Sequence, residues 1–460
     1  MFDYRKIRKN ITFDTGCFKG KKADVLGFGV SNVPLVGFLL DKGAEVTVRD
    51  KKDFSLLGKA ALDCSERGAR FVCGDDYLSG IDGDFVFRSP GIRFDHPEIA
   101  RAVKNGAVLT SEMELFFELC PGRIVGVTGS DGKTTTTTLI HLCLLDYFGK
   151  DRVFVGGNIG EPLLPKLGMM DSESWAVVEL SSFQLQTMKK SPDISIITNI
   201  APNHLDYHTG MDEYIESKTN IFRHQDYGRV VLNTKNEITR GLASLVPKGS
   251  ETLGFAGSGT VESEGMIVRE GTPFFRTDEI LIPGRHNVEN FEGVIAAIGD
   301  IVPCGVIEKT ARTFKGVPHR IELVRELRGV RFYNSSIDSS PTRTAAALRS
   351  FTHGEKITVI CGGYDKHIPF GPLADVLCEK ADKVVLTGAT ADKILSALTE
   401  KEERPEIYVE PDFEKAVRKA AGLAYPGGVV ILSPACASFD SFRNFEERGN
   451  RFRDIINSLE

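Results

Sequence analysis

Short apolar runs alternate with amphipathic stretches along most of this chain. In the first hundred residues, an apolar run at 22–27 enters a glycine-rich turn, and a helical stretch follows at 33–40. Further strand-like runs lie at 44–48 and 82–87. Strands that alternate with helices are typical of βαβ units, which build parallel sheets. The pattern therefore predicts an α/β unit at the N-terminal end.

The same pattern starts again twice. The later strand-like runs lie at 124–127, 175–179, 194–198 and 228–232, and then at 330–334, 357–361, 383–387 and 428–432. Between these two sets, short runs alternate with glycine at 250–283, which predicts a small antiparallel appendage. We predict three consecutive α/β domains, at 1–112, 113–316 and 317–460.

Composition supports this interpretation and excludes other classes. The length of 460 residues fits three domains, and 41% hydrophobic with 26% charged residues excludes a disordered or fibrous chain. A net charge of −6 argues against a nucleic-acid partner. We expect no membrane span and no signal peptide. Because the nine cysteines are scattered, with no C-x-x-C pair, we expect a cytoplasmic protein with free thiols.

The strongest chemical signal is the turn TGSDGKT at 128–134, between a predicted strand and a predicted helix. Its glycines let backbone N–H groups face phosphate oxygens, and the helix adds the positive end of its dipole. Lys133 can neutralise β- and γ-phosphates, and the Thr134 hydroxyl can bind Mg²⁺. The standard P-loop has four residues between its first glycine and the Gly-Lys pair, whereas here Gly126 leaves five and Gly129 leaves two before Gly132. The turn is therefore a variant P-loop. It predicts a nucleoside triphosphate site; the alternative is a glycine-rich turn with a solvated lysine.

A second glycine turn, Gly27-x-Gly29-x-x-Asn32, also lies between a strand and a helix. Asp50 ends the next strand, where an acid that binds a ribose would lie. The turn resembles a dinucleotide fingerprint whose third glycine is replaced. Three interpretations stay open: a dinucleotide site, a site for another nucleotide diphosphate, and an ordinary tight turn. With the three α/β units, these two turns predict a Rossmann-like N-terminal domain, a P-loop-type central parallel sheet and a Rossmann-like C-terminal domain.

Three further positions are candidates for a metal site. Glu179 ends a buried strand and can reach a Mg²⁺ held by Thr134, although a surface acid is the alternative. His204 and Asp206 follow the next strand and could form a ligand and its support, although a single histidine is usually structural. Lys218, by itself, is an ordinary solvated helix lysine.

Taken together, these motifs resemble the Mur ligases, the ATP-dependent amide ligases of peptidoglycan precursor synthesis. The motifs are GKT at 132–134, ELSSFQ at 179–184, NHLD at 203–206, RHN at 285–287 with Asn290, and PHR at 318–320. The block SPACASFDSFRNFEERG at 433–449 narrows the resemblance to the branch that joins D-glutamate to UDP-N-acetylmuramoyl-L-alanine. The likeness runs in order through all three predicted domains.

The resemblance implies a set of binding residues for each substrate. For the UDP-linked substrate these are Gly27, Gly29, Ser31, Asn32, Arg49, Asp50, Ser89, Pro90, Gly91 and Asn158. For ATP they are Gly129, Ser130, Asp131, Gly132, Lys133, Thr134, Thr135, Asn290 and Arg320. For D-glutamate they are Ser339, Lys366, Ser438 and the backbone near Phe445.

The resemblance also implies two Mg²⁺ ions. Thr134 and Glu179 would bind one of them, and His204 and a carbamylated Lys218 would serve the other. Carbamylation gives a lysine carboxylate-like oxygens, which suit a hard cation. Lys133, Glu179, His204 and Lys218 are therefore the expected catalytic residues.

One stretch departs from the family pattern. Where the family commonly has NDSKAT, this chain reads NSSIDS at 334–339, so Ser335 replaces the Asp that usually meets the ATP ribose. We hypothesise that Asp338 or solvent takes this role, and the departure also bears on Ser339. Cys436 lies beside the expected D-glutamate site and is more simply interpreted as a small buried residue than as a catalytic one.

The expected reaction has two steps. The alanyl carboxylate attacks the γ-phosphate of ATP, giving an acyl phosphate and ADP, and the D-glutamate amine then displaces phosphate. We expect a monomer. The alternatives are a sibling ligase, such as folylpolyglutamate synthase or a Mur enzyme for another amino acid, a non-catalytic nucleotide-binding regulator, and an NAD-dependent oxidoreductase.

Overall fold

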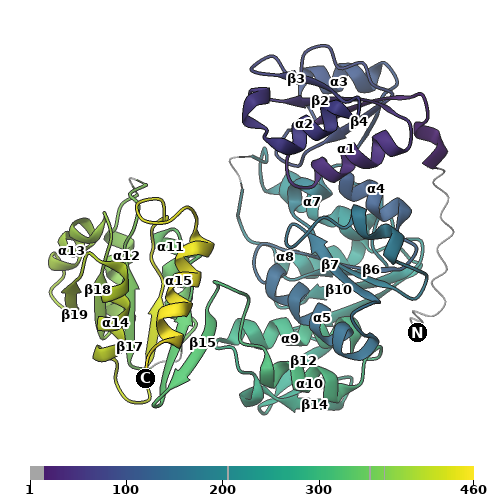
Figure 1. The fold of residues 1–460 in the computed structure, drawn as a ribbon. Helices are drawn as coiled ribbons and strands as arrows, with labels where there is room; N and C mark the ends of the chain where they lie inside the picture. The colour runs from purple at the N-terminus through teal and green to yellow at the C-terminus, as the bar shows by residue number, and fades with distance from the viewer. Residues whose placement is uncertain (1–14, 205–206, 352–353, 367) are drawn as a thin grey trace. The chain divides into compact units, whose positions relative to one another are not determined.

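A computed structural model describes residues 15–204, 207–351, 354–366 and 368–460. Three sheets follow one another along the chain, with helices packed against them (Figure 1). This confirms the predicted α/β fold class.

The N-terminal sheet is fully parallel, with the strand order β3-β2-β1-β4-β5. Most residues of β1 and β4 are buried, as expected for inner strands of a parallel sheet. Its elements are β1 (Lys22–Leu26), α1 (Asn32–Asp41), β2 (Glu45–Asp50), α2 (Lys59–Glu66), β3 (Arg70–Cys73), β4 (Phe85–Arg88), α3 (Pro97–Lys104) and β5 (Val108–Thr110).

The central sheet has the order β14-β13-β12-β11-β10-β9-β6-β8-β7. Strands β7 to β11 pair in parallel around β6, so the turn after β6 is flanked by the turns after β8 and β9. The strands are β6 (Arg123–Thr128), β7 (Val153–Gly157), β8 (Trp175–Glu179), β9 (Ile194–Ile197), β10 (Gly228–Asn233), β11 (Ser250–Phe255), β12 (Thr260–Ser263), β13 (Met266–Arg269) and β14 (Thr272–Arg276). The helices are α4 (Glu112–Leu119), α5 (Lys133–Phe148), η4 (Leu164–Met169), α6 (Ser182–Leu185), α7 (Met211–Arg223), α8 (Glu237–Gly241), α9 (Arg285–Ile298) and α10 (Cys304–Thr313).

The C-terminal sheet has the order β15-β16-β20-β17-β18-β19. Only β15 runs antiparallel to its neighbour. Its elements are β15 (Glu322–Leu327), β16 (Val330–Asn334), α11 (Pro341–Arg349), β17 (Ile357–Cys361), α12 (Gly371–Lys380), β18 (Lys383–Leu386), α13 (Ala391–Thr399), β19 (Glu406–Val409), α14 (Phe413–Leu423), β20 (Val429–Leu432) and α15 (Phe445–Asn457).

The chain divides into two compact units. The first holds the residues up to 275 together with 289–310, and the second holds 276–288 and 311–460. The N-terminal and central sheets both belong to the first unit. The boundaries of the three predicted domains therefore remain a prediction.

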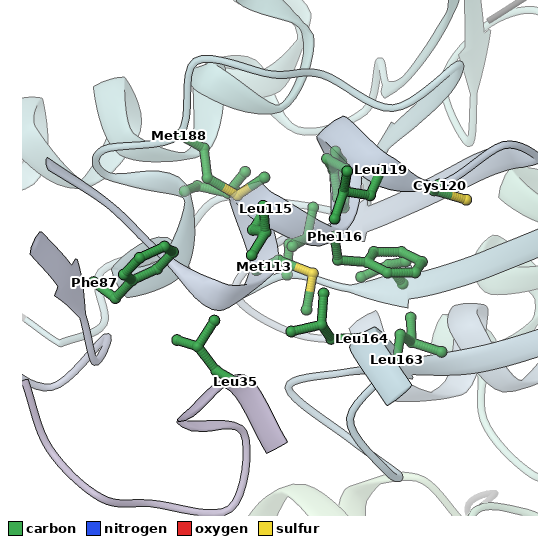
Figure 2. Packing of buried hydrophobic residues seen from close by; sticks show 14 of the residues in the cluster. Leu35, Phe87, Met113, Leu115, Phe116, Leu119, Cys120, Leu163, Leu164 and Met188 are labelled. Carbon is green, nitrogen blue, oxygen red and sulfur yellow. The ribbon is translucent and has the colours of Figure 1, made fainter. Parts of the chain in front are cut away.

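Helix α4 supplies much of the core that the first two sheets share. Seven of its eight residues are buried. In Figure 2, Met113 of α4 lies in one hydrophobic cluster with Leu35 of α1, Phe87 of β4 and Leu164 of η4. This common core supports the loops at the ends of both sheets.

Two expectations about strands need correction. The region 250–283 is only in part an antiparallel appendage, because β11 pairs in parallel with β10 along its whole length. Beyond β11, β12 and β13 are paired antiparallel, and β14 pairs with β13 at the edge of the sheet. The expected third strand at 82–87 is the fourth strand of the chain, because β3 precedes it. Every residue of β3 is at least partly exposed, so it lacks the apolar run that marks the inner strands.

Two general features of the described residues bear on function. None of their helices is long and apolar enough to cross a membrane. The nine cysteines, all within the described ranges, are free thiols.

Candidate active site

The turn after β6 has the backbone that its glycines predict. Gly129 and Gly132 both have positive φ angles, of 149° and 77°, and α5 begins at Lys133. A Cβ on Gly129 would lie 1.9 Å from Thr198 Oγ1, and one on Gly132 would lie 2.6 Å from Asn290 Oδ1. Only glycine fits at these positions. The close approach also places Asn290, a predicted nucleotide contact, against the turn.

Two lysine side chains lie at this turn. Lys133 Nζ donates hydrogen bonds to the carbonyls of Gly129 and Ser130, at 2.9 and 2.8 Å. Lys218, on α7, donates from Nζ to the same Gly129 carbonyl at 2.8 Å. Its side chain is only 1% exposed. Burial, followed by the neighbouring Lys133 cation, holds the pKa of Lys218 well below its ordinary value. Lys218 is therefore not the solvated lysine that its sequence context alone suggests.

Glu179 lies at the carboxyl end of β8, next to β6. The residue is buried, and its Oε1 accepts a hydrogen bond of 2.9 Å from Asn158 Nδ2. Its buried Oε2 has no hydrogen-bond partner among the described residues. A buried, unsatisfied carboxylate oxygen costs free energy unless a cation or another donor binds it. This atom therefore fits a hard cation, as do the hydroxyl of Thr134 and a carbamylated Lys218.

His204 follows β9 and has a positive φ of 54°. Its carbonyl accepts hydrogen bonds from the backbone N–H groups of Tyr207 and His208, at 3.1 and 3.0 Å. The imidazole lies edge-on to Phe183, with ring centroids 5.0 Å apart. Asp206, its expected support, lies outside the described residues. Within the described ranges, no three His, Cys, Asp or Glu side chains gather as a ready-made metal site.

The turn after β1 lies against the loop after β4. Gly27 has a φ of 84°, and a Cβ on it would lie 2.6 Å from Ser89 Oγ. Asn32 Nδ2 donates to the Gly27 carbonyl at 2.8 Å and to Ser89 Oγ at 3.0 Å. Asn32, which replaces the third glycine of the dinucleotide fingerprint, therefore joins the β1–α1 turn to the loop after β4. Asp50 Oδ2 accepts from the N–H of Phe28 at 2.7 Å.

Three other expected contacts of the UDP-linked substrate lie around these loops. Ser31 occupies the N-cap position of α1, and its hydroxyl makes no capping hydrogen bond. Pro90 offers its carbonyl to Tyr207 Oη at 3.1 Å, and Gly91 is exposed next to it.

Arg49 has a different position from the one expected of a ligand contact. It is 4% exposed, and its Nε donates to Asp24 at 2.5 Å. Its terminal nitrogens donate to the carbonyls of Ser79 and Gly80, at 2.8 and 2.9 Å. These bonds hold the 77–80 segment against β2. A contact between Arg49 and substrate would first require this buried ion pair to open.

In the second unit, the expected D-glutamate residues lie on loops after neighbouring strands. Lys366, after β17, donates from Nζ to the Ser339 carbonyl at 3.3 Å. Tyr364 N–H donates to the Ala437 carbonyl at 2.9 Å, which joins this loop to the one that holds Ser438. Because β17 and β20 are adjacent, their carboxyl ends meet at one edge of the sheet.

Arg448 of α15 ties these loops together. It is 2% exposed, and it donates to the Ser336 hydroxyl and to the carbonyls of Cys436 and Ala437 at 3.0 to 3.1 Å. Burial lowers the pKa of its guanidinium to about 10. The Phe445 carbonyl, one turn earlier, accepts from the Ser336 hydroxyl at 2.8 Å. Sequence reasoning did not single out Arg448, because an arginine in a polar helix gives no sign that it is buried.

Asp338, the candidate for the ribose role, is also buried. It accepts a hydrogen bond of 2.8 Å from Ser433 Oγ, and burial raises the pKa of its carboxyl. The nearby guanidinium of Arg320, a predicted nucleotide contact, opposes this shift. Asp338 would have to leave Ser433 in order to bind a ribose.

Known proteins share both the motifs and the fold. Residues 127–298 match the Mur ligase middle domain, and residues 319–436 match the Mur ligase glutamate ligase domain. The UDP-N-acetylmuramoylalanine–D-glutamate ligase of Acetivibrio thermocellus is 48% identical over 96% of this chain and 97% of its own. The chain belongs to the Mur ligase family.

Solved structures agree with this assignment of the Mur ligase fold. The UDP-N-acetylmuramate–alanine ligase of Thermotoga maritima matches with a TM-score of 0.57 at 21% identity, over 96% of this chain and all of its own. The MurF ligase of Thermotoga maritima, solved in complex with ADP, matches with a TM-score of 0.54 at 18% identity, over 99% of both chains.

One residue of this Mur ligase, Tyr214, lies near the turn although the sequence motifs omit it. Tyr214 lies one helical turn before Lys218, with its ring centroid 4.7 Å from Lys218 Nζ. Its hydroxyl lies 2.9 Å from Ser130 Oγ, in the P-loop. The spacing of four residues on a helix was the available signal, since it places both side chains on one face.

Proposed function

We propose that this Mur ligase joins D-glutamate to UDP-N-acetylmuramoyl-L-alanine at the expense of ATP, in peptidoglycan precursor synthesis. The observation that carries the proposal is the meeting of Lys133, Lys218 and Glu179 at one P-loop. The near full-length identity to a D-glutamate ligase supports this choice of substrates. We further propose a cytoplasmic monomer.

ATP would bind at the turn after β6. The backbone of residues 129–135 and the amino end of α5 would face the phosphates, and Asn290 and Arg320 would contact the nucleotide. Lys133 Nζ now donates to two backbone carbonyls of the loop. When this side chain turns to a phosphate, it exchanges these neutral acceptors for a charged one, which makes the stronger hydrogen bond. The ADP complex of the Thermotoga maritima MurF ligase supports a nucleotide in this fold.

Mg²⁺ would screen the negative charge that accumulates when a carboxylate meets a triphosphate. Thr134 and Glu179 would hold one ion, and His204 and carbamylated Lys218 would serve the second. The lowered pKa of Lys218 supports carbamylation. A neutral amine can attack CO₂, forming the N–C bond and releasing a proton, whereas an ammonium cannot.

The chain's own residues would position the reacting groups. The turn at 27–32 and the loop at 89–91 would hold the UDP end, while Asn158 would contact the substrate near its alanyl carboxylate. That carboxylate attacks the γ-phosphate, which breaks the bond to ADP and gives an acyl phosphate. In the second unit, Lys366 and Ser438 would bind the carboxylates of D-glutamate. Its amine then attacks the acyl carbon, and phosphate leaves.

Lys133→Ala tests this assignment. Phosphate release that depends on both D-glutamate and the UDP-linked substrate should fall at least about a hundredfold, because one charged phosphate contact is lost in the transition state. Binding of UDP-N-acetylmuramoyl-L-alanine, measured by calorimetry, should change less than about twofold. Lys309→Ala removes an exposed lysine that pairs with Asp146 and serves as the control. Loss of UDP-substrate binding in Lys133→Ala would contradict the assignment.

An amino-acid panel separates this function from the nearest alternative, a sibling ligase with another amino acid. With ATP and the UDP-linked substrate present, only D-glutamate should support phosphate release. Consumption of a neutral or basic amino acid instead would overturn the role of Lys366.

A further inference from the structure

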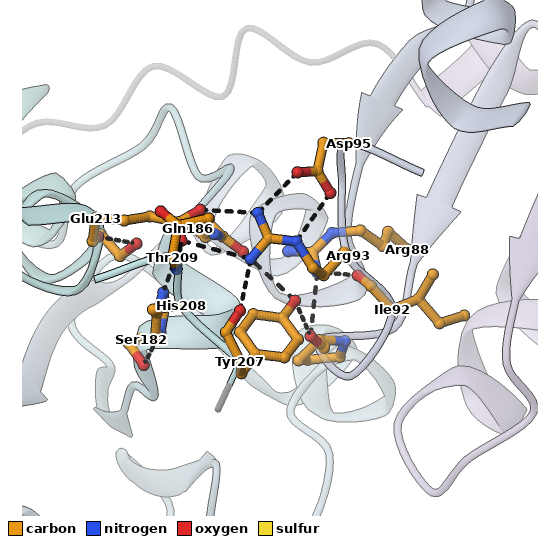
Figure 3. Close-up of polar contacts among 12 residues, drawn as sticks. Arg88, Ile92, Arg93, Asp95, Ser182, Gln186, Tyr207, His208, Thr209 and Glu213 are labelled. Atoms are coloured by element: carbon orange, nitrogen blue, oxygen red, sulfur yellow. Dashed lines mark hydrogen bonds and ion pairs between the residues drawn. The ribbon is translucent and has the colours of Figure 1, made fainter. Parts of the chain in front are cut away.

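A polar network joins two loops that serve the UDP-linked substrate and Mg²⁺ in the proposed reaction. The first, the substrate loop, comprises residues 89–92. The second, the metal loop, comprises His204 with residues 207–210. Figure 3 shows the side chains between them. Both loops belong to the first compact unit.

Arg88 holds the substrate loop through hydrogen bonds to the backbone carbonyls of the loop. It is 1% exposed, and one terminal nitrogen donates to the carbonyls of Pro90 and Ile92, at 3.1 and 2.6 Å. The other donates to the Phe183 carbonyl at 2.9 Å, four residues after Glu179. The substrate loop is therefore attached to the segment that follows β8.

Arg93 reaches the metal loop directly. Its guanidinium donates to the Tyr207 carbonyl at 2.6 Å and to Glu213 at 3.0 Å, and it also pairs with Asp95 at 2.7 Å. The Tyr207 hydroxyl donates back to the Pro90 carbonyl at 3.1 Å. Tyr207 is thus joined by a charged hydrogen bond to Arg93, which directly follows the substrate loop, and by a neutral one to Pro90 within that loop.

Two backbone hydrogen bonds connect Tyr207 and His208 to His204. The N–H groups of Tyr207 and His208 both donate to the His204 carbonyl. Glu213 also accepts from the N–H of Thr209 at 2.5 Å, so the ion pair with Arg93 fixes the loop on both sides of His208. These hydrogen bonds link the backbone of His204 to Arg93 through Tyr207.

We propose that Arg93 is a positioning residue that aligns the metal loop with the substrate loop, so that bound UDP-linked substrate and bound Mg²⁺ strengthen each other. This inference rests on the proposed function. Such coupling is reciprocal, because each ligand favours the same arrangement of the two loops.

Arg93→Gln tests the coupling. The Mg²⁺ concentration for half-maximal activity should rise about tenfold, as expected for the loss of a charged hydrogen bond, while kcat at saturating Mg²⁺ changes less than about twofold. Mg²⁺ and ADP should tighten binding of UDP-N-acetylmuramoyl-L-alanine in the wild type and have a weaker effect in the variant. A purely structural role would instead lower kcat without moving the Mg²⁺ dependence.

Two further variants keep the test decisive if Arg93→Gln folds poorly. Tyr207→Phe removes the hydroxyl bond to the Pro90 carbonyl, with a longer one to Gln186 Oε1 at 3.4 Å, and should move the Mg²⁺ dependence in the same direction, by about threefold. Arg101→Gln removes an exposed arginine of α3 that pairs with Glu98 and should leave the dependence unchanged. An unchanged Mg²⁺ dependence in folded Arg93→Gln and in Tyr207→Phe would overturn this inference. If the wild type fails to consume ATP with D-glutamate, the proposed function fails instead.

Discussion

Buried ionisable side chains in this Mur ligase differ in the interactions that offset the free-energy cost of their burial. Arg88 and Arg448 donate to several carbonyls, and Arg49 pairs with Asp24. Glu112, the first residue of α4, is compensated only in part: a backbone hydrogen bond from Leu164 reaches its carboxyl, but its Oε1 is buried without a hydrogen-bond partner among the described residues. Burial raises the pKa of Glu112 to about 7.

The shift at Glu112 predicts a pH-dependent stability. Between its ordinary pKa of 4.5 and about 7, the unfolded chain loses a proton that the folded chain keeps. The free energy of unfolding should therefore fall as the pH rises through this window, by up to about 3 kcal/mol. Glu112→Gln removes the titration. In denaturant titrations the variant should be more stable than the wild type at pH 8, and the difference should shrink towards pH 5.

Glu118→Gln provides the matched control on the same helix. Its carboxylate is partly exposed and pairs with Lys190. Its effect on stability should stay within about 0.5 kcal/mol at both pH values. An equal gain in both variants at pH 8 would show that the effect is not specific to Glu112.

Residue-scale chemistry could be predicted only where a local motif carries it. The roles expected of Lys133 and Thr134 follow from the turn in which they lie. The burial of Lys218 could not be predicted, because it depends on α7 packing beside the turn. The burial of Arg49 could not be predicted either, since its guanidinium pairs with Asp24, a partner 25 residues away, and its contact with substrate stays a prediction.

At the scale of elements, the β1–α1 turn depends on a close approach to the loop after β4. Gly27→Ala should lower the free energy of unfolding by about 1–3 kcal/mol, because alanine is strained at its positive φ and its Cβ meets Ser89 Oγ. Gly29 has no positive φ, and a Cβ added there would meet no neighbouring atom within 4 Å. Gly29→Ala should change stability by less than about 0.5 kcal/mol in the same chemical denaturation. Equal losses would contradict this explanation.

Strands and helices with long apolar runs were predictable, and short exposed ones were not. The helix after the P-loop and the inner strands of all three sheets match their sequence patterns. The edge strands β3 and β19 do not, because their residues are mostly partly exposed. At 250–283 the expected antiparallel pairing begins only at β12, since a run of short strands does not reveal that the first of them, β11, pairs in parallel with β10.

At the scale of the whole molecule, the expected contacts of the UDP-linked substrate all lie in the first compact unit. Calorimetric unfolding should show more than one transition, because the two units have separate cores. UDP-N-acetylmuramoyl-L-alanine should raise the midpoint temperature of only one transition. At a ligand concentration a hundred times its dissociation constant, the free energy of unfolding of that unit should increase by about 3 kcal/mol. A single transition that shifts as a whole would contradict two independently unfolding units.

The sequence by itself determined the α/β class, the P-loop and the likeness to Mur ligases. These rest on short-range patterns: apolar periodicity, glycine in tight turns and the order of motifs along the chain. Only the tertiary structure decided which loops meet. Asn290 of α9 lies against Gly132, and Arg93, after β4, binds Tyr207 and Glu213, because segments far apart in the chain pack against one another. Contacts between such distant segments depend on packing, which no local pattern encodes.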